Sequence, residues 1–351
     1  MLGKSLRIRQ WNYEATYDTI RHYCYGVGDE NPLWMDESYA AKGPHGTIVA
    51  PPTFLYSVFG AGINPGFPGL QSFHGGGRWE FHRPVRRSEP IRAEAKLLDL
   101  YEKHSERAGR IFVGVGEAKY STPDGEVVGV YTSRAIRVPR PAAGGKVLYE
   151  ARAPHQYTTE ELEFIEQQVL AERRRGAEPL YWEAVRIGDV VPPRVKGPLD
   201  FATMLAFYNG VGAAGYASVD TAIRRRHMAR VAPETLPNNA STYYMGRGHL
   251  DGTAAESVGM PNVYDVGWQR IAWMAQGLTD WIGDLGRLSM IDVRLDLPNV
   301  LGDTVTCRAV VTSKETVDAE SRVHFEVKAE RQDGALSARG TATAVLPRRG
   351  D

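Results

Sequence analysis

Apolar and polar side chains alternate in two groups of segments, and turn residues separate the segments within each group. The first group covers residues 90–102, 110–121 and 127–138, and the second covers residues 290–297, 303–314, 321–331 and 336–346. A period of two is typical of strands with one face on a core and one in solvent. Asp124-Gly125 and Asp333-Gly334 lie between two such segments, where a hairpin turn needs positive φ. The pattern predicts two antiparallel meanders.

An apolar segment with helical period precedes each meander. The segments are residues 53–59 and 267–282, and the second places Ile271, Met274, Ala275, Leu278 and Ile282 on one face. A helix of this kind buries its apolar face against a neighbouring sheet. We therefore predict an α+β fold in which each antiparallel sheet wraps around one central helix.

The two groups belong to an internal repeat. Residues 34–41 resemble residues 249–256 (249 − 34 = 215), whereas the Gly-Val-Gly of residues 26–28 matches residues 210–212 (210 − 26 = 184). The second copy therefore carries about 31 extra residues (215 − 184 = 31). The predicted divisions are a first unit at 1–140, a linker with a charged connector helix at 141–178, and a second unit at 179–351 with its insertion at about 213–243.

Composition and charge narrow the range of functions. The 351 residues include 42 Lys and Arg and 42 Asp and Glu, so the formal net charge is zero. This balance gives no electrostatic reason to bind nucleic acid or an anionic membrane. Since there is no signal peptide and no apolar stretch of about 18 residues, a cytoplasmic protein is expected. The two cysteines, Cys24 and Cys307, are interpreted as reduced core residues, with no zinc spacing.

Residues 25–36, which read Tyr-Gly-Val-Gly-Asp-Glu-Asn-Pro-Leu-Trp-Met-Asp, resemble the Gly-Asp-x-Asn-Pro-x-His-x-Asp signature of MaoC-like (R-specific) enoyl-CoA hydratases and acyl dehydratases. His249, Asp251 and Gly267 resemble the later part of that signature, in which a helix-start glycine follows the histidine by eighteen residues (267 − 249 = 18). Two partial signatures in one chain are similar to the double-hotdog members of this family. The resemblance implies a tandem hotdog pseudo-dimer with one continuous sheet.

The resemblance also implies a lyase activity in fatty acid metabolism. The reaction would be hydration of a 2-enoyl-CoA thioester or dehydration of a 3-hydroxyacyl-CoA, with an Asp and a His sharing one water. No cofactor is expected beyond the coenzyme A that the substrate carries. One group must take a proton while another delivers one, and a helix-start N–H is the expected donor to the thioester oxygen. The expected partners are the acyl-CoA substrate and a second copy in a homodimer.

The signature is split between the two copies. The first copy has the acid Asp29, but Trp34 stands at the histidine position, and Pro52, eighteen residues later, has no N–H. The second copy has His249 and Gly267 but no acid at the matching place. We therefore interpret the first copy as a degenerate site, with His249, Asp29 and Gly267 as the candidate catalytic residues.

Several residues remain as candidates for the missing acid and for substrate binding. In a two-fold pair the two sites lie on opposite sides of the shared sheet, so Asp29 is not expected to pair directly with His249. The alternatives are Asp220, Glu234, Asp251 and Tyr244. Tyr244 and Asp251 are also candidate substrate-binding residues, together with Arg225 and Arg226 of an arginine cluster. That cluster fits either the phosphates of coenzyme A or a solvated helical face.

Two further interpretations depend on the same residues. His74 and the three glycines after it precede a predicted strand at residues 78–85 rather than a helix, which indicates a β-bulge and not a phosphate loop. The split signature also leaves two alternative functions open, because a fold does not fix a function. These are an acyl-CoA thioesterase and a non-catalytic acyl-CoA-binding or partner subunit.

Overall fold

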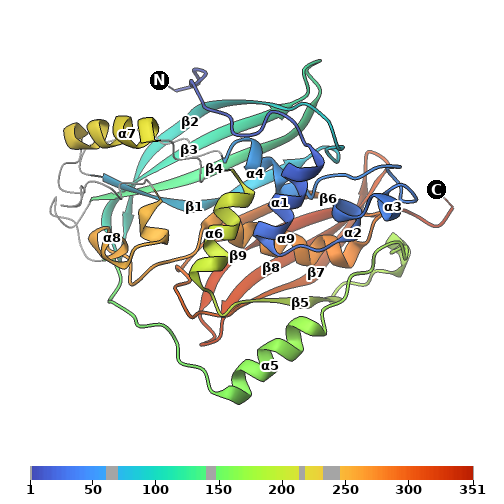
Figure 1. The fold of residues 1–351 in the computed structure, drawn as a ribbon. Helices are drawn as coiled ribbons and strands as arrows, with labels where there is room; N and C mark the ends of the chain where they lie inside the picture. Colours follow the sequence, from blue (N-terminus) through green and yellow to red (C-terminus); the bar gives the residue numbers. More distant parts are fainter. Residues whose placement is uncertain (1, 61–69, 140–147, 213–217, 232–245, 351) are drawn as a thin grey trace.

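A computed structural model describes residues 2–60, 70–139, 148–212, 218–231 and 246–350. Within these ranges the strands form one antiparallel sheet in the order β2-β3-β4-β1-β6-β9-β8-β7-β5 (Figure 1). The first half supplies β1 (Leu70–Phe81), β2 (Arg92–Ser105), β3 (Gly109–Ser121) and β4 (Val127–Pro139). The second half supplies β5 (Val190–Lys196), β6 (Arg287–Leu295), β7 (Val305–Val317), β8 (Glu320–Arg331) and β9 (Leu336–Val345).

The two halves of the sheet meet at β1 and β6, which pair antiparallel with Trp79 opposite Ile291. Both residues are fully buried. The prediction that the two sheets join edge to edge into one continuous sheet is therefore confirmed. The seven alternating segments all became strands, with bounds shifted by a few residues at their ends.

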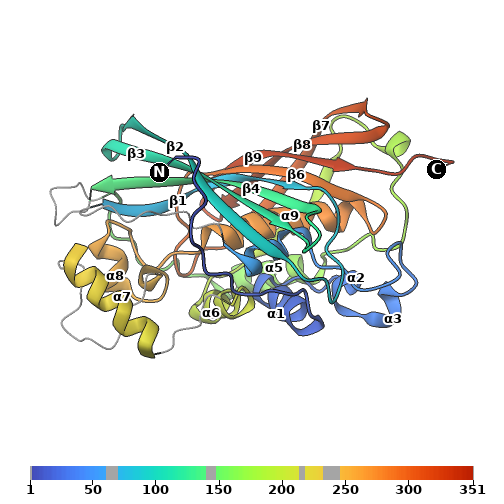
Figure 2. The same cartoon turned by 90° about the horizontal axis from the view of Figure 1, so that it is seen from above.

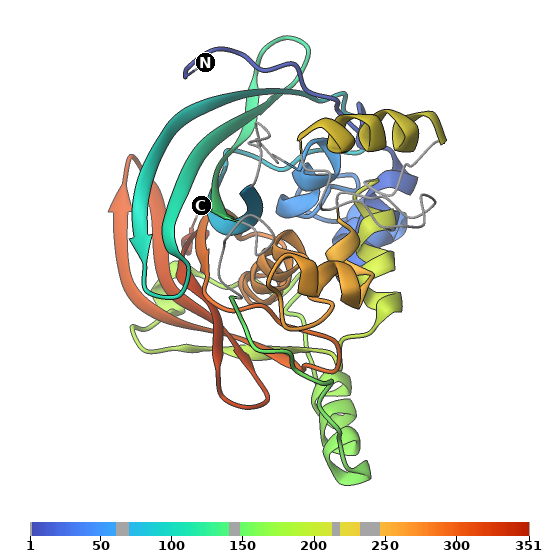
Figure 3. The same cartoon turned by 90° about the vertical axis from the view of Figure 1, so that its left-hand side faces the viewer.

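Most of the helices lie on the concave face of the sheet, which curves around them, whereas α5 projects away from it (Figures 2 and 3). The longest is α9 (Gly267–Ile282), whose predicted apolar face is buried. The others are α1 (Tyr17–Val27), α2 (Pro32–Met35), α3 (Glu37–Ala40), η1 (Pro52–Phe54), α4 (Leu55–Val58), α5 (Thr159–Leu170), η3 (Trp182–Ala184), α6 (Phe201–Gly210), α7 (Ser218–Val231), η6 (Arg247–His249) and α8 (Gly252–Ser257).

The helical segment of the first copy is short and lies where the sequence predicts it. Residues 53–59 form only η1 and α4, and the chain turns to an extended conformation at Phe59. The start of α9 occupies the neighbouring space, since the ring of Trp268 stacks on Tyr56 at 5.6 Å. A Cβ on Gly60 would lie 2.3 Å from the same indole. The helical segment of the first copy is therefore shorter than α9, and the start of α9 fills part of the space beside it.

The internal repeat is visible in matching helix ends. Gly28 and Gly212 follow α1 and α6 with φ of 71° and 72°, a left-handed conformation that glycine adopts without strain. The two helices cross at Gly26 and Gly210, where a Cβ would come within 2.8 and 2.6 Å of backbone oxygens of the other helix. The repeated glycines therefore both end the helices and allow them to pack closely.

Two features between the copies have clear local causes. Thr158 and Glu161 form the capping box that starts α5, as the sequence predicts for a connector helix, and α5 extends away from the body (Figure 1). Strand β5 was not predicted, because Pro192 and Pro193 interrupt its pattern. Proline is tolerated on an edge strand, and β5 is the last strand of the sheet. Residues 141–147 of the predicted linker lie outside the described residues.

The predicted bulge after His74 is confirmed. The register of β1 against β4 shifts between His74 and Gly77. Gly76 has φ of 104°, and a Cβ there would lie 2.0 Å from the Val293 carbonyl oxygen. The strand itself begins at Leu70, earlier than predicted. A bulge of this kind redirects a neighbouring side chain, which here is His74.

Candidate active site

A cavity of about 730 Å³ lies where the N-terminal segment and the first-half strands meet the start of α9. We call it the large cavity. His249 and Gly267, which the sequence singled out, both line it, together with His74, Arg107, Tyr149 and Trp268. Its volume is in the range of pockets that bury small organic ligands. Both copies contribute to its wall, so the site depends on the fusion of the two units.

His249 is held in a defined orientation. Its Nδ1 lies 2.8 Å from the carbonyl oxygen of Tyr264, and its ring packs against the Tyr264 ring at 4.2 Å between centroids. A carbonyl can only accept, so Nδ1 carries the proton and Nε2 carries the lone pair. Burial lowers the pKa of His249, which favours the neutral ring. The side chain is therefore set up as a proton acceptor at neutral pH.

Gly267 begins α9 close to His249. At most about 11 Å of chain separates its Cα from that of Tyr264, to which His249 is bound. The N-cap residue Val266 makes no side-chain cap hydrogen bond, so no side chain caps the first amides of the helix. A Cβ on Gly267 would lie 2.6 Å from His74 Nδ1 and 2.5 Å from a Leu295 methyl group. Glycine is required here for the close approach of His74 and Leu295.

Buried ionic contacts fix the start of α9 to the sheet. Arg270 Nε donates to Asp265 Oδ2 at 2.8 Å, and its Nη1 donates to the carbonyl oxygens of Leu297 and Ser337, both at 2.7 Å. Asp265 also accepts from the backbone and side-chain amides of Asn299. The carboxylate of Asp265 is therefore fully engaged, and its role is to position the helix rather than to transfer protons.

His74 enters the large cavity from the bulge in β1, a placement that sequence reasoning missed. Its Nε2 lies 2.7 Å from the Tyr131 hydroxyl, whereas its Nδ1 is buried and has no hydrogen-bond partner among the described residues. Burial lowers the pKa of His74 to about 3, with Arg134 adding to the effect. The bulge was readable from the glycines, but nothing in the sequence showed which cavity the redirected histidine would enter.

Asp29 lies elsewhere, in the degenerate site of the first copy. Its carboxylate accepts from the Trp34 indole N–H at 3.1 Å and from the Asn31 amide at 3.1 Å, and it does not line the large cavity. Trp34 and Pro52 line a separate cavity of about 130 Å³, which we call the small cavity. The structure therefore does not bring Asp29 to His249 in one cavity.

A buried cluster of charges adjoins Asp29. Arg194 pairs with Asp280 and with Glu172, both at 2.6 Å, and Lys196 Nζ donates to the Gly28 carbonyl oxygen at 3.1 Å. Burial, together with the nearby Asp29, raises the pKa of Asp280 to about 7. These contacts join β5, α9 and the end of α1, and Asp29 lies beside them while its own hydrogen bonds are made within the first copy.

The remaining candidates do not meet in the large cavity. Asp251 caps α8, accepting from the Ala254 amide at 3.0 Å. Arg225 and Arg226 are exposed on α7 and do not line the cavity. Asp220 also lies in α7, whereas Tyr244 and Glu234 lie outside the described residues. Arg9 and Arg107 do line the cavity, and the Arg107 guanidinium lies 4.5 Å from the centre of the Tyr149 ring.

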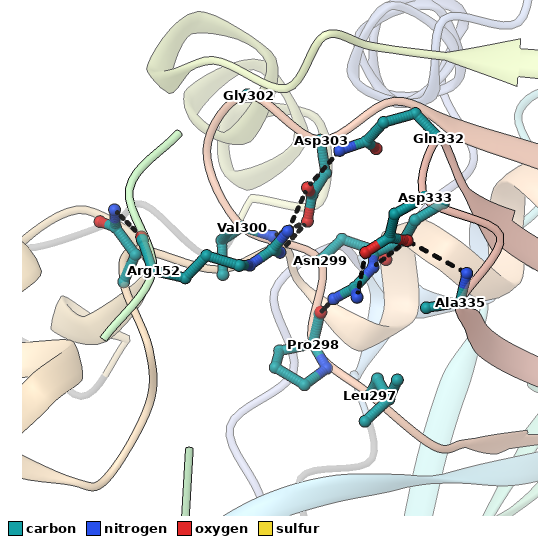
Figure 4. A network of polar contacts seen from close by, with 12 residues as sticks. Arg152, Leu297, Pro298, Asn299, Val300, Gly302, Asp303, Gln332, Asp333 and Ala335 are labelled. Atoms are coloured by element: carbon teal, nitrogen blue, oxygen red, sulfur yellow. Dashed lines mark hydrogen bonds and ion pairs between the residues drawn. The ribbon is translucent and has the colours of Figure 1, made fainter. Parts of the chain in front are cut away.

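An ion pair holds one wall of the large cavity in place (Figure 4). Arg152 Nη1 donates to Asp303 Oδ1 at 2.9 Å, and Gln332 Nε2 donates to the same oxygen at 3.0 Å. The Arg152 amide also donates to the Pro261 carbonyl oxygen at 2.9 Å. Since Leu148 and Tyr149 line the cavity just before Arg152, this network anchors the connector where it forms the wall.

Comparison with known proteins bears on the family and the fold of the chain. Residues 3–130 match the family described as FAS1-like, dehydratase domain region. A UPF0336 protein of Parafrankia sp. (strain EAN1pec) is 30% identical over 139 residues, which cover 36% of this chain and 89% of the relative. This chain belongs to the UPF0336 family. The resemblance to MaoC-like hydratases and dehydratases is confirmed with it.

Solved structures extend the similarity of this UPF0336 member over its whole length. A MaoC-like dehydratase superposes with a TM-score of 0.67 at 16% identity, covering 99% of this chain and 98% of the other. A conserved hypothetical protein of Mycobacterium tuberculosis, described as having a double hotdog fold, gives a TM-score of 0.57 at 12% identity over 98% and 96% of the two chains. The predicted tandem hotdog fold is thereby confirmed.

Two features are absent from the described part of this UPF0336 protein. Among its described residues, no group of three or more His, Cys, Asp or Glu side chains could hold a metal ion. None of the helices described is both long enough and apolar enough to cross a lipid bilayer.

Proposed function

We propose that this protein is a hydro-lyase that adds water to a 2-enoyl-CoA thioester, or removes it from a 3-hydroxyacyl-CoA, in the large cavity. The observation that carries the proposal is the placement of a neutral, oriented His249 and the uncapped start of α9 in one cavity. Membership in a family with a dehydratase region supports the reaction class. Coenzyme A enters as part of the substrate.

His249 supplies the proton transfers in this proposal. Its Nε2 takes a proton from water while the oxygen forms a bond to the β-carbon of the enoyl group, and the π electrons move toward the thioester oxygen. The resulting enolate is stabilised by the N–H of Gly267 and by the N-terminal dipole of α9. The protonated ring then returns its proton to the α-carbon, so that water has been added in total and the base is regenerated.

A second function is favoured by one specific observation. Among the described residues that line the large cavity, the carboxylates are Asp265 and Asp296, and arginines pair with both. The Asp of the family's Asp–His pair thus has no free counterpart in that part of the chain. This favours a non-catalytic acyl-CoA-binding subunit as the alternative.

One assay distinguishes the hydro-lyase, the acyl-CoA-binding subunit and the thioesterase. The protein is incubated with 2-enoyl-CoA thioesters of increasing chain length, and both the absorbance of the conjugated thioester and the release of free thiol are followed. We expect loss of the conjugated absorbance without thiol. Release of thiol would indicate a thioesterase. Binding of the thioester, measured by calorimetry, with neither change would indicate a binding subunit.

A further inference from the structure

His74 has a geometry that a purely structural histidine does not require. It comes from the first copy, yet it lines the large cavity beside the start of the second copy's central helix. Its Nδ1 is buried without a partner among the described residues, which is costly for a polar nitrogen in a protein interior. The same nitrogen lies so close to Gly267 that a Cβ there would be 2.6 Å away.

The contact with Tyr131 determines which nitrogen carries the proton. The Tyr131 hydroxyl lies 2.7 Å from His74 Nε2, and burial raises the pKa of that phenol, so it keeps its proton as a donor. When the phenol donates to Nε2, the proton of the neutral ring is on Nδ1. The lowered pKa of His74 keeps the ring neutral. With the phenol as the donor, the unpartnered atom beside Gly267 is an N–H group.

We propose that His74 is a catalytic residue whose Nδ1–H, together with the amide of Gly267, forms a two-donor site for the thioester carbonyl oxygen. This inference rests on the proposed function, since it specifies how the same cavity polarises an acyl thioester. A neutral imidazole is suited to the task because it donates a hydrogen bond without introducing a charge that the cavity would have to solvate. The first copy would thus supply part of the second copy's site.

The position of His74 in the large cavity also explains the glycine-rich bulge of β1 and the glycine at position 267, which the repeat alone leaves unexplained. The glycine-rich bulge of β1 is needed to turn His74 toward the cavity, since Gly76 has a left-handed φ and contacts β6 too closely for a side chain. Gly267 is needed because any side chain would displace His74. The glycines of the β1 bulge and Gly267 therefore both allow one contact between the two copies, which is the contact of His74 with the start of α9.

The test measures carbonyl polarisation directly, apart from turnover. Butyryl-CoA labelled with ¹³C at the thioester carbonyl has no double bond to hydrate, and isotope-edited infrared spectroscopy reports its carbonyl stretch when bound. We expect a shift to lower wavenumber in the wild-type protein. His74→Leu should lose much of that shift, whereas His74→Asn, which keeps an N–H near the position of Nδ1, should retain most of it. Gln71→Ala on the same strand is the control and should match wild type.

Kinetics with the enoyl thioester gives a second measure. Loss of one oxyanion donor typically lowers kcat by about 10²–10³-fold, so His74→Leu should lower kcat by that order with a smaller change in KM. Tyr131→Phe keeps the His74 ring in place but removes the hydroxyl that fixes its tautomer. We expect an intermediate loss of kcat for this variant. This variant carries the test if His74→Leu does not fold.

The outcomes separate this inference from the proposed function. A wild-type protein that does not bind butyryl-CoA, or that releases its thiol, contradicts the proposed function and removes the basis of the inference with it. Binding with a carbonyl stretch that is the same in wild type, His74→Leu and Tyr131→Phe overturns the role of His74 alone.

Discussion

The two copies of the signature occupy matching places in the fold but have opposite chemical character. In the first copy, Trp34 is 6% exposed and donates its indole N–H to Asp29, and the adjoining small cavity measures about 130 Å³. In the second copy, His249 is bound to a backbone carbonyl and borders a cavity of about 730 Å³. One substitution replaces a proton acceptor with a hydrogen-bond donor and fills the space that a substrate would need.

The comparison shows how a duplicated unit can divide its tasks. The first copy keeps the acid of the signature, but its hydrogen bonds are made within that copy, beside the buried cluster of Arg194 and Asp280. It also gives His74 to the cavity of the second copy. The second copy keeps the histidine and the helix-start glycine. The central claim is therefore that one composite site exists, formed mainly by the second copy.

The largest expected effect is the loss of His249. His249→Ala should lower turnover of the enoyl thioester by about 10²–10⁴-fold, because the general base is removed. The melting temperature should change little, since the ring makes one hydrogen bond to a carbonyl. The matched change in the first copy, Trp34→Phe, removes the indole N–H and should leave turnover within a few-fold of wild type. A loss below about tenfold in His249→Ala would contradict the assignment.

A substitution of Asp29 tests more sharply whether the first-copy site takes part in catalysis. Asp29→Asn keeps the shape of the side chain in the first-copy site, so turnover should stay within a few-fold of wild type. If the family's Asp–His pair operated across the two copies, this variant and His249→Ala would lose similar activity, and the double mutant would be little worse than either. Steady-state rates of the three variants decide between these outcomes.

The two sites should also respond to pH in opposite directions. The pKa of His74 is lowered to about 3, below its unfolded value of about 6.5, so the unfolded chain binds the extra proton as pH falls. Stability should therefore be intact above about pH 6.5 and fall below it by up to about 1.4 kcal/mol per pH unit. Urea unfolding of wild type and His74→Asn at several pH values measures this change in the free energy of unfolding. The variant should not show the loss of stability below about pH 6.5.

Asp280 gives the contrasting response. Its pKa is raised to about 7, so the folded state holds a proton that the unfolded state has lost above about pH 4. Stability should fall as pH rises from about 4 to about 7. In the same unfolding series, the free energy of unfolding of Asp280→Asn should rise relative to that of wild type over that pH interval. Parallel curves for the two proteins would contradict the assigned direction.

The smallest expected effect concerns the coenzyme A end of the substrate. Arg107 borders the large cavity, whereas Arg225 is exposed on α7 away from its lining. Arg107→Ala should raise KM several-fold with little change in kcat, because an exposed cation contributes about 1 kcal/mol or less. Arg225→Ala and Arg226→Ala should leave KM unchanged. An equal rise in KM in all three variants would favour the arginine cluster on α7 as the site that binds the coenzyme A phosphates.

Much of the fold follows from the sequence for identifiable reasons. Alternating segments predicted the strands of the meanders, and the repeated Gly-Val-Gly marked the matching ends of α1 and α6. Strand β5 was missed because Pro192 and Pro193 hide an edge strand. The short helical segment of the first copy was predicted at residues 53–59, but its packing against Trp268 of the other copy was not, since that is a contact between distant residues.

The site was only partly predictable for the same reason. His249 and Gly267 carry a local motif with fixed spacing, and the structure places both in one cavity. His74 has no motif that links it to them, because its role depends on how β1 pairs with β6 across the junction of the copies. Arg107 and Tyr149 likewise reach the cavity through the packing of a hairpin and the connector, which no single segment encodes.

The central claim is tested most directly by locating a bound acyl-CoA in a crystal structure of the protein. A saturated thioester such as butyryl-CoA avoids hydration during the experiment. The account predicts that the thioester carbonyl oxygen lies within hydrogen-bond distance of the Gly267 amide, with His249 facing the β-carbon and the small cavity empty. A thioester bound beside Trp34 and Pro52, with the large cavity vacant, would contradict it.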